Sequence, residues 1–384
     1  MTSLPGQRWA LIRQPVYVFL LARTLLTILG MGLWLAGLAH AGPAAPTPSA
    51  AATVTYKLSG MLLGVWQRFD ALHYLRIAAS GYATTSLSVF YPLFPALVRL
   101  TAPALGGNLL AAAFFISNLA CLLLLIVFYR LMVAEGMAQA TAQRALLYLV
   151  FAPVGVFLLV PYTESLFLLL SLASFHAARR GRWGWAALAG FAAALTRLQG
   201  VVLTLVLGWE ILEQAGRSLA RLKWRGLLAL TPMLGAALFM AARAWAGYPP
   251  IGEVLQTVWH RYAAVPGYGL VLAVGRIVQG QAYPMEYLDL FYALLMLGLG
   301  IWVLRRLPLS YTCYLWGMLL LNLSQFQQGD PLSGQSRYAL ALFPAFIGLA
   351  ELGRSPARHR LMVYASMALW LFSAGVYVMG GFVG

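Results

Sequence analysis

The 384-residue chain has little charge for its length: only 9% of its residues are charged, while 61% are hydrophobic. A soluble domain carries charge on about a quarter of its residues, so this scarcity excludes an ordinary soluble fold. Apolar runs such as 109–128 reach the length of about 20 residues that crosses a bilayer as a helix. Because helices satisfy their own backbone hydrogen bonds in lipid, the composition predicts an all-α polytopic membrane protein.

The sequence also lacks the motifs of several site classes. Its two cysteines, Cys121 and Cys313, lie in apolar runs and indicate neither a disulfide nor a metal site. It has no phosphate loop ending in Gly-Lys-Ser/Thr and no dinucleotide fingerprint, so nucleotide-driven chemistry is not expected. Asp70 and His73 could share a ligand face, but no further cluster completes a metal site. We therefore expect no cofactor, and no motif supports a divalent metal.

Acidic residues are scarce beside basic ones, 10 against 26, which gives a formal net charge of +16. In a soluble chain this excess would suggest a nucleic-acid partner. Here the basic residues form short clusters between apolar runs, at 178–182, 217–225, 305–306 and 354–360. This is the positive-inside pattern, which reports orientation. We expect these clusters to be cytoplasmic, and we expect no nucleic-acid partner.

The apolar runs predict about eleven spans, with a cytoplasmic N-terminus. The spans fall near 16–40, 108–132, 143–160, 163–179, 184–196, 199–214, 226–246, 287–304, 309–324, 337–352 and 361–380. The first outer loop, 42–107, begins with a Pro-, Ala- and Thr-rich segment (42–55) and contains an interfacial helix at 89–105. Residues 247–286 form a second outer loop, with an amphipathic helix at 253–262. We expect residues 1–384 to form a single integral membrane domain.

The stretch WQRFDALHYLRIAASGY (66–82) places ionisable groups at the predicted membrane edge, where such groups are functional candidates. If it is helical, Asp70, His73 and Tyr74 share one face, by their three- and four-residue spacing. A carboxylate there can accept a proton from an attacking hydroxyl. Alternatively, Asp70 caps the helix N-terminus beside Arg68. These residues alone leave both roles open.

Three further outer-side motifs carry charge: LTRLQG with Arg197, QSRYAL with Arg337, and VPYTES with Glu164. The fork of an arginine matches phosphate oxygens, but an arginine can also extend toward lipid headgroups. Glu164 is either an early-helix residue favoured by the helix dipole or an acceptor for a sugar hydroxyl. His260 and Arg261, in the second outer loop, are less specific candidates.

These stretches resemble the PIG-V family, GPI mannosyltransferase II and its bacterial relatives, within the GT-C superfamily of membrane glycosyltransferases. RFDALHYLRIAASGY followed by FYPLFPAL resembles the first outer loop of that family. Residues 151–203 resemble its middle region, with a turn of the Y-[ST]-E type and an arginine before a short helix. GQSRYALALFPAF (334–346) resembles its late segment.

The resemblance implies a GT-C fold and an inverting transfer of mannose from a polyprenyl-phosphate donor. The acceptor would be a hydroxyl of a lipid, glycan or protein. The enzyme would lie in a bacterial plasma membrane, surrounded by membrane lipid, with its site on the periplasmic or extracellular side. Two alternatives remain. A transporter or flippase of lipid-linked sugars would show paired repeats and charges near the midplane. A non-catalytic assembly subunit would use Asp70 only for stability.

The resemblance also assigns roles to residues. Asp70 matches the aspartate assigned as general base in such enzymes. The charge that develops on the leaving phosphate requires cations. The best candidates for these cations are Arg197 and Arg337, with Arg68 and Arg76 in reserve. The residues expected to position the sugar or the acceptor are His73, Tyr74, Tyr91, Tyr162, Glu164 and Gln199.

Overall fold

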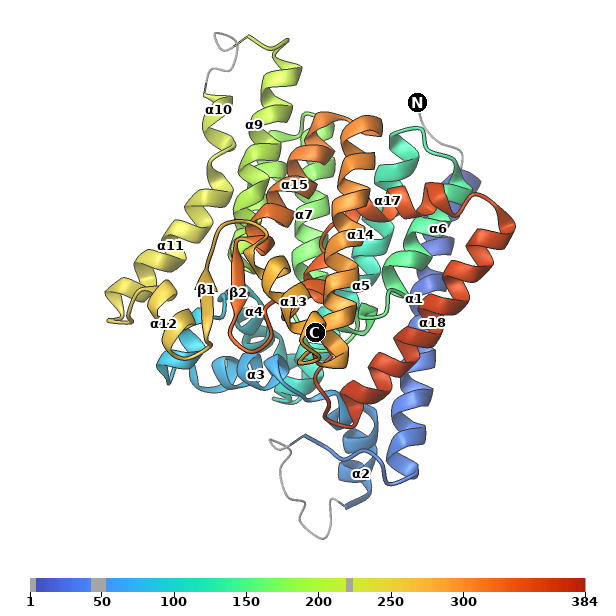
Figure 1. The fold of residues 1–384 in the computed structure, drawn as a ribbon, viewed down its shortest axis with the longest axis vertical. Helices are drawn as coiled ribbons and strands as arrows, with labels where there is room; N and C mark the ends of the chain where they lie inside the picture. The colour runs from blue at the N-terminus through green and yellow to red at the C-terminus, as the bar shows by residue number, and fades with distance from the viewer. Residues whose placement is uncertain (1–4, 43–52, 219–223, 384) are drawn as a thin grey trace. The chain divides into compact units, whose positions relative to one another are not determined.

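The computed structural model of the protein describes residues 5–42, 53–218 and 224–383, and helices dominate this part of the chain (Figure 1). The structure is mostly helical, as the sequence predicts, with one short two-stranded ribbon. Among these described residues, four helices are long and apolar enough to cross a membrane, judged by length and composition: Leu11–Leu35, Leu109–Ala134, Pro284–Arg306 and Pro356–Val378. The total of about eleven spans and the interfacial position of 89–105 stay predictions. Residues 43–52 of the Pro-rich segment and residues 219–223 of one basic cluster lie outside the described residues.

The chain divides into two compact units. Unit 1 comprises Met1–Gly81, Phe94–Leu166 and Ala350–Val383, and unit 2 comprises Tyr82–Leu93, Phe167–Leu349 and Gly384. Asp70 and Glu164 belong to unit 1, whereas Arg197 and Arg337 belong to unit 2.

Unit 1 is built around α1, which packs beside α5, α6 and α18 (Figure 1). Its helices are α1 (Pro5–Leu35), α2 (Thr53–Leu62), η2 (Gly64–Trp66), α3 (Asp70–Ser80), α4 (Leu93–Thr101), η4 (Ala102–Leu105), α5 (Leu109–Ala134), α6 (Gln139–Val150), η5 (Gly155–Leu158) and α18 (Pro356–Val378). The span predicted at 143–160 is interrupted, because α6 ends at Val150 and an irregular segment follows. Pro153 explains the break: it lacks an N–H and disfavours helical geometry in the residue before it.

Unit 2 contains the helix pairs α8 with α11, α9 with α15, and α14 with both α15 and α16. Its elements are η3 (Thr85–Val89), α7 (Glu164–Arg179) from Phe167 onward, α8 (Trp183–Ala194), η6 (Leu198–Val202), α9 (Leu203–Gln214), α10 (Arg225–Leu228), α11 (Thr231–Trp245), α12 (Ile251–Thr257), β1 (Arg261–Ala263), α13 (Tyr268–Val278), α14 (Pro284–Arg306), α15 (Leu309–Leu323), β2 (Gln325–Gln327), α16 (Gln335–Ala339) and α17 (Phe343–Leu352).

A short ribbon connects two distant parts of unit 2. Strands β1 and β2 pair antiparallel, with Arg261 opposite Gln327 (Figure 1). The helix predicted at 253–262 is therefore shorter than expected, because α12 ends at Thr257 and His260 turns with a φ of 50° into β1. Pairing with a strand more than 60 residues away replaces the local helix.

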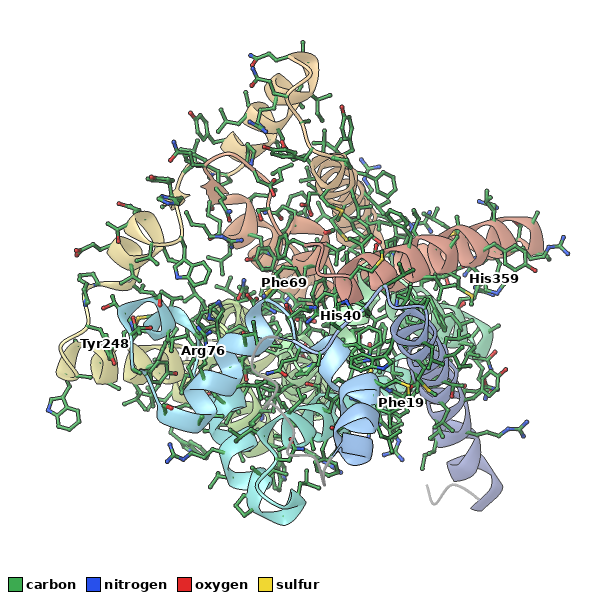
Figure 2. The ribbon with its side chains drawn as sticks, turned by 90° about the horizontal axis from the view of Figure 1, so that it is seen from below. Phe19, His40, Phe69, Arg76, Tyr248 and His359 are labelled. Atoms are coloured by element: carbon green, nitrogen blue, oxygen red, sulfur yellow. The ribbon has the colours of Figure 1, made fainter. Side chains whose placement is uncertain are left out.

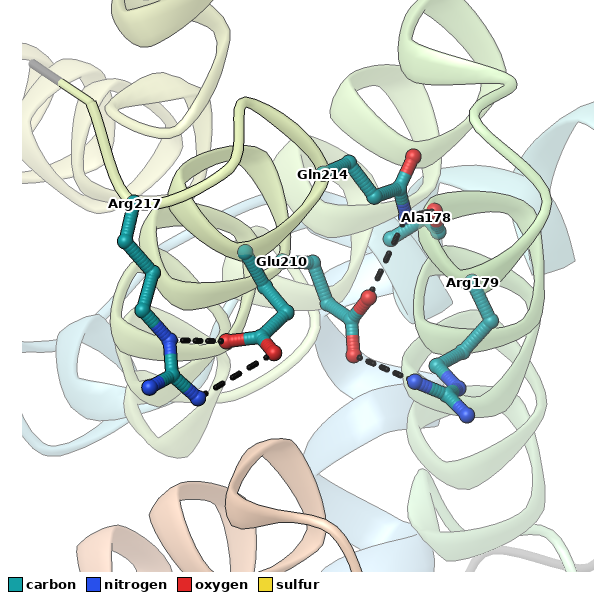
Figure 3. A network of polar contacts seen from close by, with 6 residues as sticks. Ala178, Arg179, Glu210, Gln214 and Arg217 are labelled. Atoms are coloured by element: carbon teal, nitrogen blue, oxygen red, sulfur yellow. Dashed lines mark hydrogen bonds and ion pairs between the residues drawn. The ribbon is translucent and has the colours of Figure 1, made fainter.

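A polar network joins α7 to α9 (Figure 3). Glu210 is buried, and its Oε1 lies 3.2 Å from Nη1 of Arg179. Gln214 donates to the other oxygen of Glu210 (3.2 Å) and to the carbonyl of Ala178 (2.9 Å). A buried carboxylate requires such partners, so the network holds the two helices together where the 178–182 basic cluster lies.

Replacing Gly200 with alanine should destabilise the protein at the LTRLQG turn. A Cβ at Gly200 would come within 2.6 Å of the Ala193 carbonyl carbon and closer still to Ala194, so the backbone would have to shift. We expect a cost of about 1–3 kcal/mol, seen as a lower Tm in detergent. Gly208→Ala on α9 is the matched control, because its new methyl would meet only the Cβ of Ala229, at 4.0 Å. Equal Tm values for the two variants would contradict the close approach.

Candidate functional site

The first candidate group lies at the beginning of α3, in unit 1. Asp70 is the first residue of α3, and its side chain is half-buried. The N-cap position is taken by Phe69, which has a φ of 49°. The N-cap position is thus Phe69 rather than Asp70, and Asp70 is the next residue. Its carboxylate lies in the first turn, where the helix dipole favours negative charge.

Phe69 has a backbone conformation that bulky residues rarely adopt, and aromatic contacts hold it there. Its ring meets the edges of Tyr377 and Phe382, with centroid separations of 5.7 and 5.2 Å. Phe69 is labelled in Figure 2, next to the end of α18. Strain of this kind persists only where the surroundings enforce it, and it is common at functional sites.

Two tyrosine hydroxyls fix the same bend through hydrogen bonds. The hydroxyl of Tyr162 accepts from the backbone N–H of Asp70 (3.2 Å) and donates to the carbonyl of Arg68 (3.4 Å). The hydroxyl of Tyr377 donates to the carbonyl of Trp66 (3.1 Å). The backbone around Asp70 is thus held by residues from two other segments. Sequence reasoning missed Tyr377, because no local pattern marks a tyrosine in an apolar run as a partner of a residue about 300 positions earlier.

The predicted face of α3 meets the VPYTES turn. The hydroxyl of Tyr74 lies 3.4 Å from Oγ1 of Thr163, and both side chains are buried. Glu164, also buried, begins α7 directly after this turn. The structure therefore brings the two predicted motifs of unit 1 together.

The reserve cations of unit 1 differ in their surroundings. Arg68 donates through Nη2 to the carbonyls of His40 (2.5 Å) and Val378 (3.2 Å), while its buried Nε has no partner among the described residues. Arg76 is exposed on α3; it and His40 are labelled in Figure 2. The guanidinium of Arg68 therefore binds backbone carbonyls of two other segments, and Arg76 is exposed.

His73 should make the protein less stable in acid. Burial lowers the pKa of His73 below its ordinary 6.5; Asp70 raises it and Arg76 lowers it further. As the pH falls through and below about 6.5, the unfolded chain takes up a proton that the folded chain binds less readily, so stability decreases. His73→Gln should therefore lose less Tm between pH 8 and pH 5.5 than the parent protein does. An equal loss in both proteins would contradict this contribution.

The second candidate group lies in unit 2, around the ring of Tyr338. The guanidinium carbons of Arg197, Arg261 and Arg337 lie 5.5, 5.8 and 5.7 Å from its centroid. We call these three residues the arginine cluster. Arg261 also donates to the hydroxyl of Tyr338 and to Oε1 of Gln327, the latter at 3.1 Å. Arg337 and Tyr338 are each only 8% exposed.

Three guanidiniums around one ring concentrate positive charge, and the attraction of such charge for an anion is strong where water is scarce. Guanidinium forks also match phosphate oxygens. The structure thus unites the two arginines predicted as phosphate ligands, Arg197 and Arg337. It adds Arg261, whose approach depends on the pairing of β1 with β2.

Amide side chains form a second polar group in unit 2. Gln199 donates to Oδ1 of Asn322 (3.3 Å), and Gln335 donates to the Asn322 carbonyl (3.1 Å). Gln199 follows Arg197 by two residues, and Gln335 precedes Arg337 by two. Tyr91 packs on Phe239 of α11, with ring centroids 4.6 Å apart, and its buried hydroxyl has no partner among the described residues.

The chain is similar to known proteins over part of its length. The sequence model of the family described as Mannosyltransferase (PIG-V) matches residues 13–237. The GPI alpha-1,6-mannosyltransferase 2 of Rattus norvegicus is 31% identical over 173 residues, covering 42% of this chain and 35% of the relative. That of Mus musculus is 33% identical over 156 residues, covering 37% and 30%. The match thus spans about a third of each curated relative.

The fold is similar to that of ArnT from Cupriavidus metallidurans, in a crystal structure with undecaprenyl phosphate bound. The TM-score is 0.52 at 16% identity, and the match covers 92% of this chain and 62% of that one. At this identity the likeness concerns the fold alone, and it supports the predicted GT-C architecture.

The family match covers more than half of the chain, and it includes Asp70, Glu164 and Arg197. The resemblance that the motifs suggested is confirmed, and the chain belongs to the mannosyltransferase (PIG-V) family.

Proposed function

We propose that the protein is an inverting membrane glycosyltransferase that moves mannose from a polyprenyl-phosphate donor to a hydroxyl acceptor. Membership of the PIG-V family supports the sugar and the reaction. The fold likeness to ArnT with undecaprenyl phosphate bound supports the class of donor. The observation that carries the proposal is the arginine cluster around Tyr338, because a lipid-linked phosphate is an anion that such a cluster binds.

The proposed reaction is a single displacement. The acceptor oxygen bonds to the anomeric carbon of mannose as the bond from that carbon to the phosphate oxygen breaks. The carboxylate of Asp70 takes the proton of the acceptor hydroxyl, and the electron pair of the broken bond leaves with polyprenyl phosphate. Because phosphate is stable as an anion, no strong general acid is required, and the arginine cluster stabilises the charge that develops on it.

The surroundings of Asp70 suit a base that must not move. The bend at Phe69 is fixed by ring contacts and by the hydroxyls of Tyr162 and Tyr377. Such preorganisation keeps a catalytic group in its reactive geometry. We assign His73, Tyr74 and Glu164 to positioning of the acceptor or sugar around Asp70.

The residues proposed to bind the donor divide into those for its phosphate and those for its sugar. We propose that Arg197, Arg261 and Arg337 bind the phosphate, since Arg68 is occupied with backbone carbonyls. Gln199 would bind sugar hydroxyls, because its amide lies in the group formed with Asn322 and Gln335. Tyr91 has a buried hydroxyl that suits contact with a sugar or acceptor hydroxyl. We place the reaction on the outer face of a bacterial plasma membrane, and we propose that it needs no metal.

Transfer assays with the protein in lipid nanodiscs test this function. Radiolabelled polyprenyl-phosphate mannose is supplied with a panel of lipid, glycan and peptide acceptors. We expect a labelled glycoside with inverted anomeric configuration, no product from a nucleotide-linked mannose, and unchanged activity with EDTA. Movement of the donor across proteoliposome membranes without any glycosidic product would overturn the proposal in favour of a transporter.

A further inference from the structure

Asp289 is a buried carboxylate in unit 2 that has no part in the reaction proposed above. It lies in α14, a helix long enough to span the membrane, and it is only 2% exposed. An ionisable side chain in such a helix is costly to bury. Its Oδ1 accepts a hydrogen bond of 2.7 Å from the backbone N–H of Ser336.

This hydrogen bond supplies an N-terminal cap, which α16 does not have from its own residues. The N-cap of α16 is Gly334, with a φ of 81° and no side chain to cap the helix. The first N–H groups of a helix have no partner within it, and Ser336 contributes one of them. Asp289 therefore caps α16 from a different helix, immediately before Arg337 and Tyr338.

The end of α14 that carries Asp289 is itself fixed. Glu286 is fully buried one turn before Asp289. Both of its oxygens accept from Arg276, each at 2.9 Å, and one also accepts from the backbone N–H of Tyr283 (3.1 Å). A carboxylate held in this way fixes the position of its helix end, so the turn of α14 that carries Asp289 is rigid.

The position of α16 decides where the arginine cluster forms. Arg337 belongs to α16, and Arg197 and Arg261 both lie over the ring of Tyr338, its neighbour in α16. A small rotation of this five-residue helix would move one cation and the ring that the other two contact. The hydrogen bond from Ser336 to Asp289 opposes that rotation.

We infer that Asp289 is a positioning residue that holds α16 in the orientation in which Arg337 and Tyr338 complete the arginine cluster. It contacts no substrate, and its effect on the reaction rests on the proposed phosphate-binding role of that cluster. Asp289→Asn keeps an oxygen that accepts from Ser336, whereas Asp289→Leu keeps the branched shape of the side chain and removes the acceptor.

The first readout does not depend on function. Hydrogen exchange of the peptide covering 335–341 should be about tenfold faster in Asp289→Leu than in the parent, because the backbone N–H of Ser336 loses its buried acceptor. Asp289→Asn should stay within about threefold of the parent. Unchanged exchange in Asp289→Leu would overturn the inference. If that variant fails to fold, Asp289→Asn decides alone, since tenfold faster exchange there would overturn it.

The second readout is a double-mutant cycle on the donor KM. Asp289→Leu should raise the donor KM about tenfold with little change in kcat, and Asp289→Asn should restore it. Combined with Arg337→Ala, Asp289→Leu should add less than threefold, because the cation that it positions is gone. A full tenfold addition would overturn the positioning of Arg337. Faster exchange with an unchanged donor KM would support the cap and overturn the phosphate role of the cluster.

Discussion

Asp70→Asn should reduce the rate of mannosyl transfer by about 10²- to 10⁴-fold, the usual contribution of a general base. Asparagine has the same shape, but it cannot take up the acceptor proton near neutral pH. The bend that presents residue 70 should survive, because Tyr162 binds its backbone N–H and the aromatic contacts belong to Phe69. Donor affinity should stay within about threefold, since the loss concerns proton transfer alone.

Single-turnover transfer of labelled mannose measures this rate without interference from product release. Ser80→Ala, at the exposed end of the same helix, is the control for a change in α3. Asp70→Glu retains a base displaced by one methylene and should recover part of the rate. Transfer by Asp70→Asn at the parent rate would remove Asp70 from the mechanism.

Arg337→Ala and Arg197→Ala should each lower kcat/KM for the donor by about 10- to 100-fold. A hydrogen bond to a charged partner contributes about 1.5–3 kcal/mol, and each variant removes one side of the arginine cluster around Tyr338. Arg337→Lys should be intermediate, because lysine keeps the charge and loses the planar fork. The two alanine changes should not be additive, since both residues contact the same ring.

Initial rates over a range of donor concentrations give kcat/KM for each variant. Arg305→Ala is the matched control, because this substitution also removes one positive charge from unit 2, at an exposed position near the end of α14. It should leave kcat/KM unchanged. An equal decrease in the control and in the cluster variants would mean that net charge, rather than the cluster, governs use of the donor.

Most helices of this protein follow from local sequence, and so does the face of α3, although the span predicted at 337–352 is divided into α16 and α17. Apolar runs and the spacing of Asp70, His73 and Tyr74 reflect burial along a single helix, which a sequence records directly. The break after α6 was missed although Pro153 marks it, because the apolar run continues through the irregular segment. Hydropathy does not distinguish a buried loop from a buried helix.

The contacts that organise each candidate group could not be predicted in the same way. Phe69 adopts a positive φ because rings from the C-terminal region surround it, and nothing in a phenylalanine indicates that conformation. Arg261 reaches Tyr338 through strand pairing across more than 60 residues. Arg68 was predicted as a reserve phosphate ligand, and the sequence carries no sign of the backbone carbonyls that it binds.

Binding of polyprenyl phosphate without a sugar separates the two candidate groups most directly. Equilibrium binding in nanodiscs, measured with labelled polyprenyl phosphate, should be the same for the parent and Asp70→Asn, because the base takes no part in holding the phosphate. Arg197→Ala and Arg337→Ala should each bind at least about tenfold more weakly. Parent-like binding by both arginine variants, or weakened binding by Asp70→Asn alone, would contradict the assignment of phosphate to the arginine cluster and of proton transfer to Asp70.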